Sequence, residues 1–311
     1  MQRRSFLQAS ALLGAGLFID NKSLFAFDKL NSKFGGVQMG VITYSYRSLP
    51  GSAEQILQYC VDSGVNAIEL MGDAAEDFAG APSANKEVWK TLKAPERNKQ
   101  MAAWRETASM DKFHELKKMY NKAGVSIYAF KPDALGERNT DAEIEYALKA
   151  AKALDANSVT VELQKPEQSK RLGELAAKHK VYIGYHAHTQ ATDTAWDIAL
   201  GQSPYNSMNL DCGHYIAAGG ANTKDTLLAL IEAKHDRITS MHMKDRLNKD
   251  HGGANKPWGE GDTPIKEILS LLKEKKYKIP ATVELEYEVP KDSDPVKEVR
   301  KCIAFAKNIL A

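Results

Sequence analysis

Ionisable side chains recur at the ends of short β-rich segments in this sequence. Five consecutive segments end in acids or histidines: Glu162; His186 with His188; Asp211 with His214; His242 with Lys244; and Glu284 with Glu286. An earlier segment carries Glu69. Carboxylates and imidazoles that converge from different strands are suitable ligands for Mn²⁺, Zn²⁺, Co²⁺ or Mg²⁺. Because buried charge is costly unless it is paired or metal-bound, the pattern predicts one divalent metal site.

These side chains can meet only if the strands that carry them are parallel neighbours. Eight β-rich segments alternate with helical patterns, at 39–44, 67–71, 126–130, 158–163, 182–186, 208–211, 238–243 and 281–287. Strand–helix alternation predicts a parallel sheet, and eight such units predict a single-domain (β/α)8 TIM barrel over residues 35–311. An open doubly wound sheet is the alternative, but no glycine-rich dinucleotide loop follows the first segment.

Several local patterns mark the helices between the strands. Ser52 with Gln55 and Thr140 with Glu143 have the spacing of capping boxes. Thr263 before Pro264 predicts an N-cap followed by a proline in the first helical position. Residues 73–122 are longer than one helix needs, so we expect extra helices near the barrel mouth.

The first 34 residues have the pattern of an export signal. Arg3 and Arg4 precede Phe6 and Leu7, and an apolar run follows over residues 9–19. That run is too short for a membrane-spanning helix, which needs about 20 residues. The arginine pair resembles the twin-arginine signal of bacteria, with cleavage expected between residues 26 and 36 and a periplasmic destination. A buried N-terminal helix is the alternative.

Composition excludes other classes of protein. The chain carries 42 Lys and Arg against 40 Asp and Glu, and the first 34 residues account for five of the basic and two of the acidic side chains. The remainder therefore has a charge of −1, which argues against a nucleic-acid partner. Cys60, Cys212 and Cys302 form no CxxC pair, so we expect them to be buried or free rather than bridged.

Five motifs together resemble the xylose-isomerase-like TIM-barrel family of sugar isomerases and epimerases, over about residues 37–310. They are Tyr185-His186-Ala187-His188, Asp211-Cys212-Gly213-His214, His242-Met243-Lys244-Asp245, Gly259-Glu260-Gly261 and Glu284-Leu285-Glu286-Tyr287. The resemblance implies that Asp211, His242 and Glu284 hold one divalent metal. It also implies that His214 binds substrate, with His188 and Lys244 beside the same space.

The chain departs from the family on the fifth strand. Many family members carry a glutamate there that is both ligand and base, whereas this chain has His186. We expect His186 to be the fourth ligand and Glu162, Glu284 and Glu286 to be the candidate catalytic carboxylates. Glu286 is also an alternative to Glu284 as ligand. Weaker candidates for substrate contact are Glu69, Trp258, Glu260, Lys131 and Arg105.

The chemistry predicted for this site is proton abstraction next to a carbonyl through a metal-stabilised enediolate. We therefore expect a metal-dependent isomerase or epimerase that acts on a small sugar or glycoside. A periplasmic lyase or hydratase that acts on keto-sugars or 3-keto-glycosides by β-elimination is the first alternative. A non-catalytic sugar-binding protein and an endonuclease-like protein are the others. A homo-oligomer is compatible with the sequence, and a stable membrane span is not expected.

Overall fold

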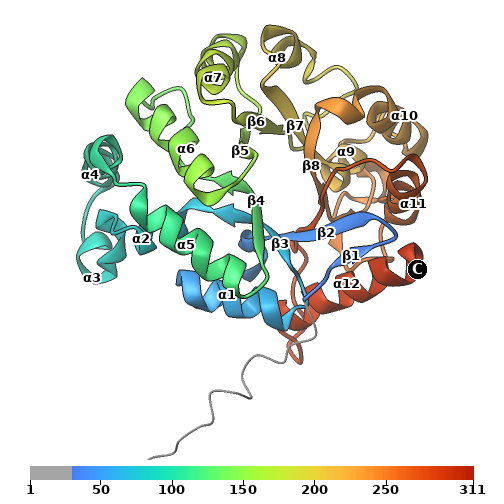
Figure 1. The fold of residues 1–311 in the computed structure, drawn as a ribbon. Helices are drawn as coiled ribbons and strands as arrows, with labels where there is room; N and C mark the ends of the chain where they lie inside the picture. Colours follow the sequence, from blue (N-terminus) through green and yellow to red (C-terminus); the bar gives the residue numbers. More distant parts are fainter. Residues whose placement is uncertain (1–29) are drawn as a thin grey trace, which may run out of the picture.

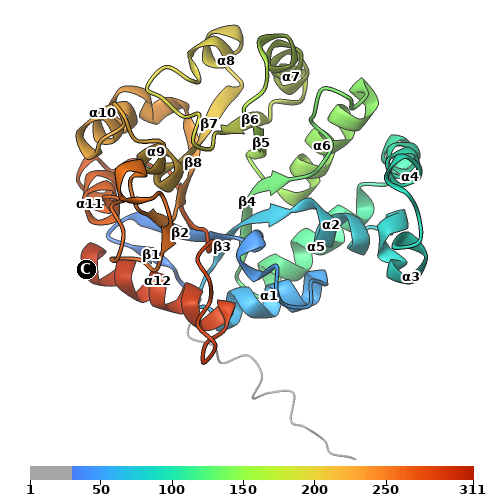
Figure 2. The ribbon, with the colours of Figure 1, turned by 180° about the vertical axis from the view of Figure 1, so that it is seen from behind.

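The computed structural model describes residues 30–311, whose parallel strands close into a barrel (Figures 1 and 2). The wall consists of β2 (Val37–Ile42), β3 (Ala67–Met71), β4 (Ser126–Lys131), β5 (Ser158–Glu162), β6 (Tyr182–His186), β7 (Asn206–Asp211), β8 (Ile238–Met243) and β11 (Ala281–Val283). β2 pairs with β3 on one side and with β11 on the other, which closes the sheet. The predicted (β/α)8 barrel is confirmed, and the open-sheet alternative is wrong.

Helices surround the barrel wall (Figure 1). They are α1 (Ala53–Asp62), α5 (Asp111–Lys122), α6 (Asp141–Leu154), α7 (Pro166–His179), α8 (Asp197–Gln202), α9 (Cys212–Ala218), α10 (Lys224–Lys234), α11 (Ile265–Lys275) and α12 (Pro295–Leu310). Both predicted capping boxes are present, at the starts of α1 and α6. The predicted start of α11 is wrong: Pro264 is its N-cap, and the Thr263 hydroxyl instead accepts a hydrogen bond from the Arg246 amide.

The long segment between β3 and α5 forms α2 (Gly72–Phe78), α3 (Lys86–Trp89) and α4 (Ala94–Thr107). In Figure 1, α3 and α4 lie outside the ring of barrel helices. A buried ion pair holds α4 in place, because Arg105 contacts Glu76 on α2 at 3.0 Å and Glu143 on α6 at 3.2 Å. The expectation that Arg105 binds an anionic substrate group is wrong, because two carboxylates of the protein already occupy its guanidinium.

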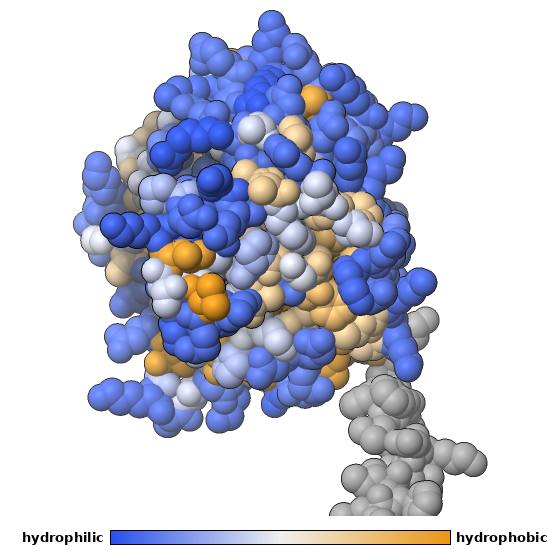
Figure 3. Space-filling model, turned by 90° about the vertical axis from the view of Figure 1, so that its left-hand side faces the viewer, coloured by the Kyte–Doolittle hydropathy of each residue, from blue (hydrophilic) through white to orange (hydrophobic). Residues whose placement is uncertain are grey.

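On the side that carries α3 and α4, hydrophilic residues cover much of the surface, and more hydrophobic residues form a broad area near the centre and a few smaller patches (Figure 3). Val88 on α3 is one of the large apolar side chains exposed to solvent. Among residues 30–311, no helix is both long and apolar enough to cross a membrane.

The chain before β2 is tied into the barrel. β1 (Lys33–Phe34) pairs antiparallel with β2. The buried Ser32 hydroxyl donates to the Met39 carbonyl at 2.7 Å, and the Asn66 side chain donates to the Leu30 carbonyl at 3.2 Å. Residues 30–34, which the sequence assigned to the export segment, therefore belong to the folded unit. The rest of that predicted segment lies outside the described residues.

The opposite end of the chain closes the barrel beside β2. The Ser45 hydroxyl, which follows β2, lies 3.4 Å from the Val283 carbonyl and accepts from the Leu285 amide at 3.1 Å. Arg47 donates to the Leu285 carbonyl at 2.7 Å. β11 ends at Val283, earlier than predicted, so these contacts hold the segment that carries Glu284 and Glu286.

Buried apolar side chains fill the space between the barrel wall and the helices. Cys60, Cys212 and Cys302 are all buried and unbridged, as expected. The inside of the barrel is polar instead, with Glu69, Thr160, Asn209 and Ser240 all fully buried. These polar side chains lie beneath the residues that end the strands.

Candidate active site

The four residues predicted to hold a metal meet at the C-terminal end of the barrel. His186 ends β6, Asp211 ends β7, His242 lies in β8 and Glu284 follows β11, and all four are buried. His242 Nδ1 lies 2.8 Å from Glu284 Oε2 and 3.8 Å from Asp211 Oδ2. His186 Nε2 lies 3.8 Å from the same Asp211 oxygen. One ligand atom from each of His186, Asp211 and His242 therefore falls within the space of a single ion.

The orientation of His242 is fixed by Glu69, which is fully buried on β3. His242 Nε2 lies 2.8 Å from Glu69 Oε2, so this nitrogen carries the hydrogen and donates it. Thr160 and Asn209 also donate to the Glu69 carboxylate, at 2.6 Å and 3.1 Å. A carboxylate that accepts from the far nitrogen of a ligand histidine is a common support for metal sites. Glu69 therefore positions His242, and its burial keeps it from the substrate contact that the sequence suggested.

Asn209 fixes the orientation of His186. The Asn209 amide nitrogen donates to Glu69 and to Ser240, which leaves its carbonyl oxygen as an acceptor. That oxygen lies 3.1 Å from His186 Nδ1, so Nδ1 carries the hydrogen. The lone pair of His186 Nε2 is then free to face Asp211. His186 thus aims an unprotonated nitrogen, and His242 its Nδ1, at one point.

The donor set fits a divalent cation. Asp211 Oδ2, His242 Nδ1 and Glu284 Oε2 are buried, and none of them makes a hydrogen bond of acceptable angle with the described residues. Four carboxylates come together here. The Lys244 ammonium contacts three of them, Asp211, Glu284 and Glu286, and the fourth, Glu69, contacts His242. Buried carboxylates in such excess call for additional positive charge.

Charge within the site controls the pKa of each histidine. Burial lowers the pKa of His242, but the carboxylates of Glu284 and Glu69 outweigh burial and raise it to about 10. Burial and the neighbouring His242 lower the pKa of His186 to about 4. His186 is therefore neutral and ready to bind a cation. His242 holds a proton toward Glu284, and a bound cation would take that proton's place.

Lys244 and Glu286 lie one layer nearer the mouth. Lys244 Nζ is 2.8 Å from Glu286 Oε2 and also reaches Asp211 and Glu284. Burial disfavours the charged lysine, but these three carboxylates raise its pKa above the usual value. Lys244 is therefore a permanent cation at the centre of the site. Glu284 and Glu286 point the same way, as predicted, because both contact this ammonium.

His214 presents a hydrogen-bond donor to the same space. The Arg246 guanidinium donates to His214 Nδ1, so the neutral ring carries its hydrogen on Nε2. That Nε2 atom is buried without a hydrogen-bond partner among the described residues and lies 3.8 Å from Glu286 Oε2. Burial lowers the pKa of His214 to about 3, so the ring stays neutral. Its place suits the predicted role in substrate binding.

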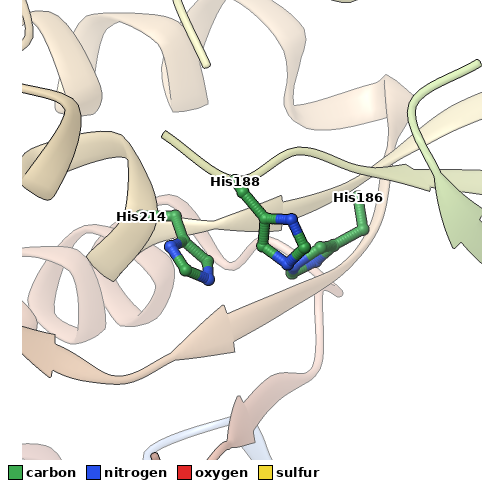
Figure 4. A group of neighbouring side chains, drawn as sticks. All are labelled: His186, His188 and His214. Carbon is green, nitrogen blue, oxygen red and sulfur yellow. The ribbon is translucent and has the colours of Figure 1, made fainter. Parts of the chain in front are cut away.

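A second carboxylate stands across the mouth, at the end of β5. Glu162 lies 3.2 Å from Lys131 Nζ and 3.5 Å from His188 Nδ1. Figure 4 shows His188 between His214 and His186, with its ring 4.5 Å and 4.9 Å from theirs. These three histidines could also surround an ion. However, the hydrogen on His214 Nε2 makes that nitrogen a donor rather than a ligand.

Two residues predicted to contact substrate lie away from this cluster. Trp258 is half-buried and packs edge-on against Phe305 of α12, with ring centroids 6.0 Å apart. Glu260 is exposed at the tip of the same loop. The loop is held by Asp245, whose carboxylate accepts from the amides of Gly259, Gly261 and Thr263. The structure does not bring Trp258 or Glu260 together with the ligand residues.

Two supporting residues were missed in the sequence, and a third, Asp245, was named there only as part of a motif. Asn209, Arg246 and Asp245 orient His186, His214 and the loop after β8, respectively. Asn209 lies two residues before Asp211, so the alternation of strand β7 places it on the same face. That alternation was the signal available for Asn209. Arg246 and His214 are 32 residues apart and share no local pattern.

Comparison with known proteins identifies one matching family and several solved structures of similar fold. The family described as "Xylose isomerase-like TIM barrel" matches residues 57–309. No curated protein matches the chain. Similar solved structures include the IOLI protein with a bound zinc atom (TM-score 0.61, 16% identity, 88% of this chain and 99% of that chain). Another is a probable 3-DHS dehydratase from Bacillus anthracis (TM-score 0.60, 17% identity, 86% of this chain and 99% of that chain). A third is D-psicose 3-epimerase with D-tagatose from Clostridium cellulolyticum H10 (TM-score 0.60, 13% identity, 88% of this chain and 99% of that chain).

Proposed function

Because the chain belongs to the xylose isomerase-like TIM barrel family, we propose that it is a metal-dependent sugar isomerase or epimerase. The observation that carries this proposal is two carboxylate–imidazole couples whose carboxylates come from opposite strands of the barrel. Glu162 ends β5 and pairs with His188, which follows β6, while Glu286 follows β11 and pairs with His214 of α9. Three strands separate β5 from β11 in either direction around the barrel.

Two bases on opposite sides suit a reaction that removes a proton from one face of a carbon and returns it elsewhere. Glu162 is ionised at neutral pH: burial raises its pKa, but Lys131 and the nearby His186 outweigh that effect and lower it. Glu286 is held by the Lys244 ammonium at 2.8 Å. In this proposal, one carboxylate accepts the proton from the carbon next to the carbonyl. The opposite couple delivers a proton to the product.

His186, Asp211, His242 and Glu284 would hold the divalent cation, which would polarise a substrate carbonyl and stabilise the negative charge that develops on its oxygen. The residues of the chain complete the site around the substrate. His214 Nε2 donates a hydrogen bond to a substrate oxygen, since it has no protein partner of its own among the described residues. The Lys244 ammonium offers a second donor on the same side.

A specific observation favours a lyase as the second candidate. His186 stands where many family members carry a catalytic glutamate, so the ligand set includes one such glutamate, Glu284, instead of two. A β-elimination needs one base and a proton donor for the leaving oxygen. Glu162 could serve as that base and the Lys244 ammonium as that donor. The fold resembles that of a probable 3-DHS dehydratase as well as that of an epimerase.

Metal content and proton exchange test the proposal together. Purified protein should contain about one divalent cation, and His242→Ala should lose it. Incubation with candidate sugars in D₂O should introduce deuterium at the carbon next to the carbonyl. Glu162→Gln and Glu286→Gln should each reduce that exchange by about 10²-fold or more. The exposed Glu260→Gln is the matched control and should exchange at the wild-type rate.

The outcomes separate the candidate functions. Deuterium incorporation without loss of an aglycone supports an isomerase or epimerase. Release of an aglycone from a 3-keto-glycoside supports the lyase instead. Full metal content in His242→Ala would contradict the assignment of His242 as a ligand. Sugar binding with no exchange and no release would leave the non-catalytic alternative.

We also propose that the chain is exported to the periplasm by the twin-arginine route and acts there on a neutral sugar or glycoside. The support is the Arg3-Arg4 pair followed by the short apolar run at 9–19. Replacing both arginines by lysine should leave the protein in the cytoplasmic fraction. Wild-type export after that replacement would contradict this proposal.

A further inference from the structure

Lys244 is a cation buried among the carboxylates of the proposed metal site. Its side chain is only 3% exposed, and Nζ lies 2.9 Å from Asp211 Oδ2 and 2.8 Å from Glu284 Oε2. Both oxygens belong to residues expected to bind the divalent cation. A third carboxylate, Glu286, lies 2.8 Å from the same nitrogen. One ammonium therefore occupies two of the four expected ligands and has one further partner.

The ammonium reaches these ligands from the layer above them. Lys244 and Glu286 each come two residues after an expected ligand, His242 and Glu284, just past the ends of β8 and β11, and their side chains lie 2.8 Å apart. Lys244 and Glu286 share the upper level, nearer the mouth. The lysine side chain leans toward Asp211 and Glu284 in the lower level while it keeps Glu286 beside it.

A lysine and a divalent cation cannot both make full use of Asp211 and Glu284. A metal ion would lie about 2.0–2.2 Å from these carboxylate oxygens, and the ammonium already lies within hydrogen-bond distance of both. Positive charges that close repel strongly in a buried site. Glu286 is then the partner that the ammonium can retain, because it lies in the upper layer and is not an expected ligand.

We propose that Lys244 is an exchangeable counter-ion of the metal site. It neutralises Asp211 and Glu284 while no divalent cation is bound, and it moves to Glu286 when a cation arrives. This inference rests on the proposed metal site. Its consequence is that the cation binds less tightly than the four ligands alone would allow, while the metal-free site remains neutralised and folded.

The test measures Zn²⁺ affinity by competition with a chromophoric chelator, together with thermal unfolding in EDTA. Lys244→Met should bind Zn²⁺ at least about tenfold more tightly and should unfold at a lower temperature in EDTA. Glu286→Gln should bind Zn²⁺ about tenfold more weakly, because the displaced ammonium has lost its other partner. In the double variant, Glu286→Gln should have no further effect, since Glu286 acts through the lysine.

Lys131→Met is the matched control. It removes a lysine at the same end of the barrel that pairs with Glu162 and contacts none of the four ligands. Its Zn²⁺ affinity should stay within about threefold of wild type, because a more distant charge interacts more weakly.

Two results would overturn the inference. The first is a Lys244→Met protein that binds Zn²⁺ no more tightly than wild type. The second is an equal effect of Glu286→Gln with and without Lys244, because direct charge repulsion or attraction would then explain it. The metal site itself fails separately, if His242→Ala leaves Zn²⁺ binding intact in either background. Absence of Zn²⁺ binding in every variant overturns both proposals.

Discussion

At the scale of single residues, hydrogen bonds decide which nitrogen of each histidine is free. His242 gives its Nε2 hydrogen to Glu69, His186 gives its Nδ1 hydrogen to Asn209, and His214 receives one at Nδ1 from Arg246. The first two rings therefore turn their other nitrogen toward the cation position: His186 as a lone pair, and His242 with the proton that a cation would replace. The third turns a hydrogen toward the substrate space. Residues outside the proposed ligand and substrate positions thus set the roles proposed for the three histidines.

Glu69→Gln should lower Zn²⁺ affinity about 10- to 100-fold, because supporting partners of ligand histidines typically have effects of that size. The variant keeps the side-chain shape but loses the charge that holds His242. Isothermal titration calorimetry on the EDTA-treated protein measures the change. Thr160→Val is the control: it removes another hydrogen bond of Glu69 but leaves His242 its partner. Equal affinities in Glu69→Gln and wild type would show that Glu69 does not support the site.

Lys131 should set the acid limb of the pH–rate profile. Burial raises the pKa of Glu162, but Lys131, with His186 and His188, outweighs burial and lowers that pKa, and Lys131 makes the largest of these lowering contributions. Lys131→Met removes this positive charge, so the pKa of Glu162 should rise. Glu162 should then gain its proton at a higher pH. The acid limb of deuterium exchange should therefore move to higher pH, measured as rate against pH from 4 to 8. A limb that stays in place would mean that Glu162 is not the base; the exposed Lys165→Met serves as control.

At the scale of elements, one side chain links a helix to the metal site. Asp211 is the N-cap of α9: its Oδ1 accepts from the His214 amide at 2.6 Å, while its Oδ2 faces His186 and His242. The same carboxylate therefore starts the helix that carries His214 and contributes a ligand. Substitutions can separate these two tasks.

Asp211→Asn and Asp211→Ala should both abolish tight Zn²⁺ binding, but only the alanine should remove the cap. We expect Asp211→Ala to be less stable than Asp211→Asn by about 1 kcal/mol, the usual contribution of such a cap. Urea unfolding in EDTA gives this difference without any contribution from bound metal. If the two variants unfold at the same urea concentration, the cap does not stabilise α9.

The helices inserted between β3 and α5, α2 to α4, depend on the buried contacts of Arg105 with Glu76 and Glu143. Arg105→Met should destabilise the protein by about 3–5 kcal/mol, because it leaves two buried carboxylates without their cation. The exposed Lys90, which pairs with Glu87, provides the control, and Lys90→Met should cost less than about 1 kcal/mol. Comparable urea midpoints for the two variants would contradict the role assigned to Arg105.

At the scale of the whole molecule, the sequence predicted the barrel and the residues at its mouth better than the contacts beneath them. The bounds of β3, β6 and β8 match the prediction, because polar or turn residues follow compact apolar runs. The contact of Glu69 with His242 spans 173 residues and leaves no local pattern. Glu69 was therefore assigned to the substrate instead of to a histidine. The packing of Trp258 against Phe305 leaves no local pattern either, because Phe305 belongs to a distant helix.

The folded unit also sets a limit on processing of the N-terminus. Cleavage of an export signal should occur before Leu30, since later cleavage would remove the buried contacts of Ser32 with Met39 and Asn66. Intact-mass measurement of protein from the periplasmic fraction should give a first residue at or before position 30. A first residue after Ser32 would contradict this limit. A chain that starts at residue 35 should unfold at a lower temperature than one that starts at residue 30.

Closure of the barrel beside Ser45 has a consequence for the order of folding. Ser45 and Leu285 meet across 240 residues of chain, and the segment they fix carries Glu284 and Glu286. Contacts of such long range form late, because loop-closure entropy opposes them until the intervening chain is in place. The complete ligand set therefore exists only after the first and last strands have joined. The arrival of a tightly held metal ion would mark the moment at which the ring is finished, and time-resolved zinc uptake during refolding would report the final step of assembly.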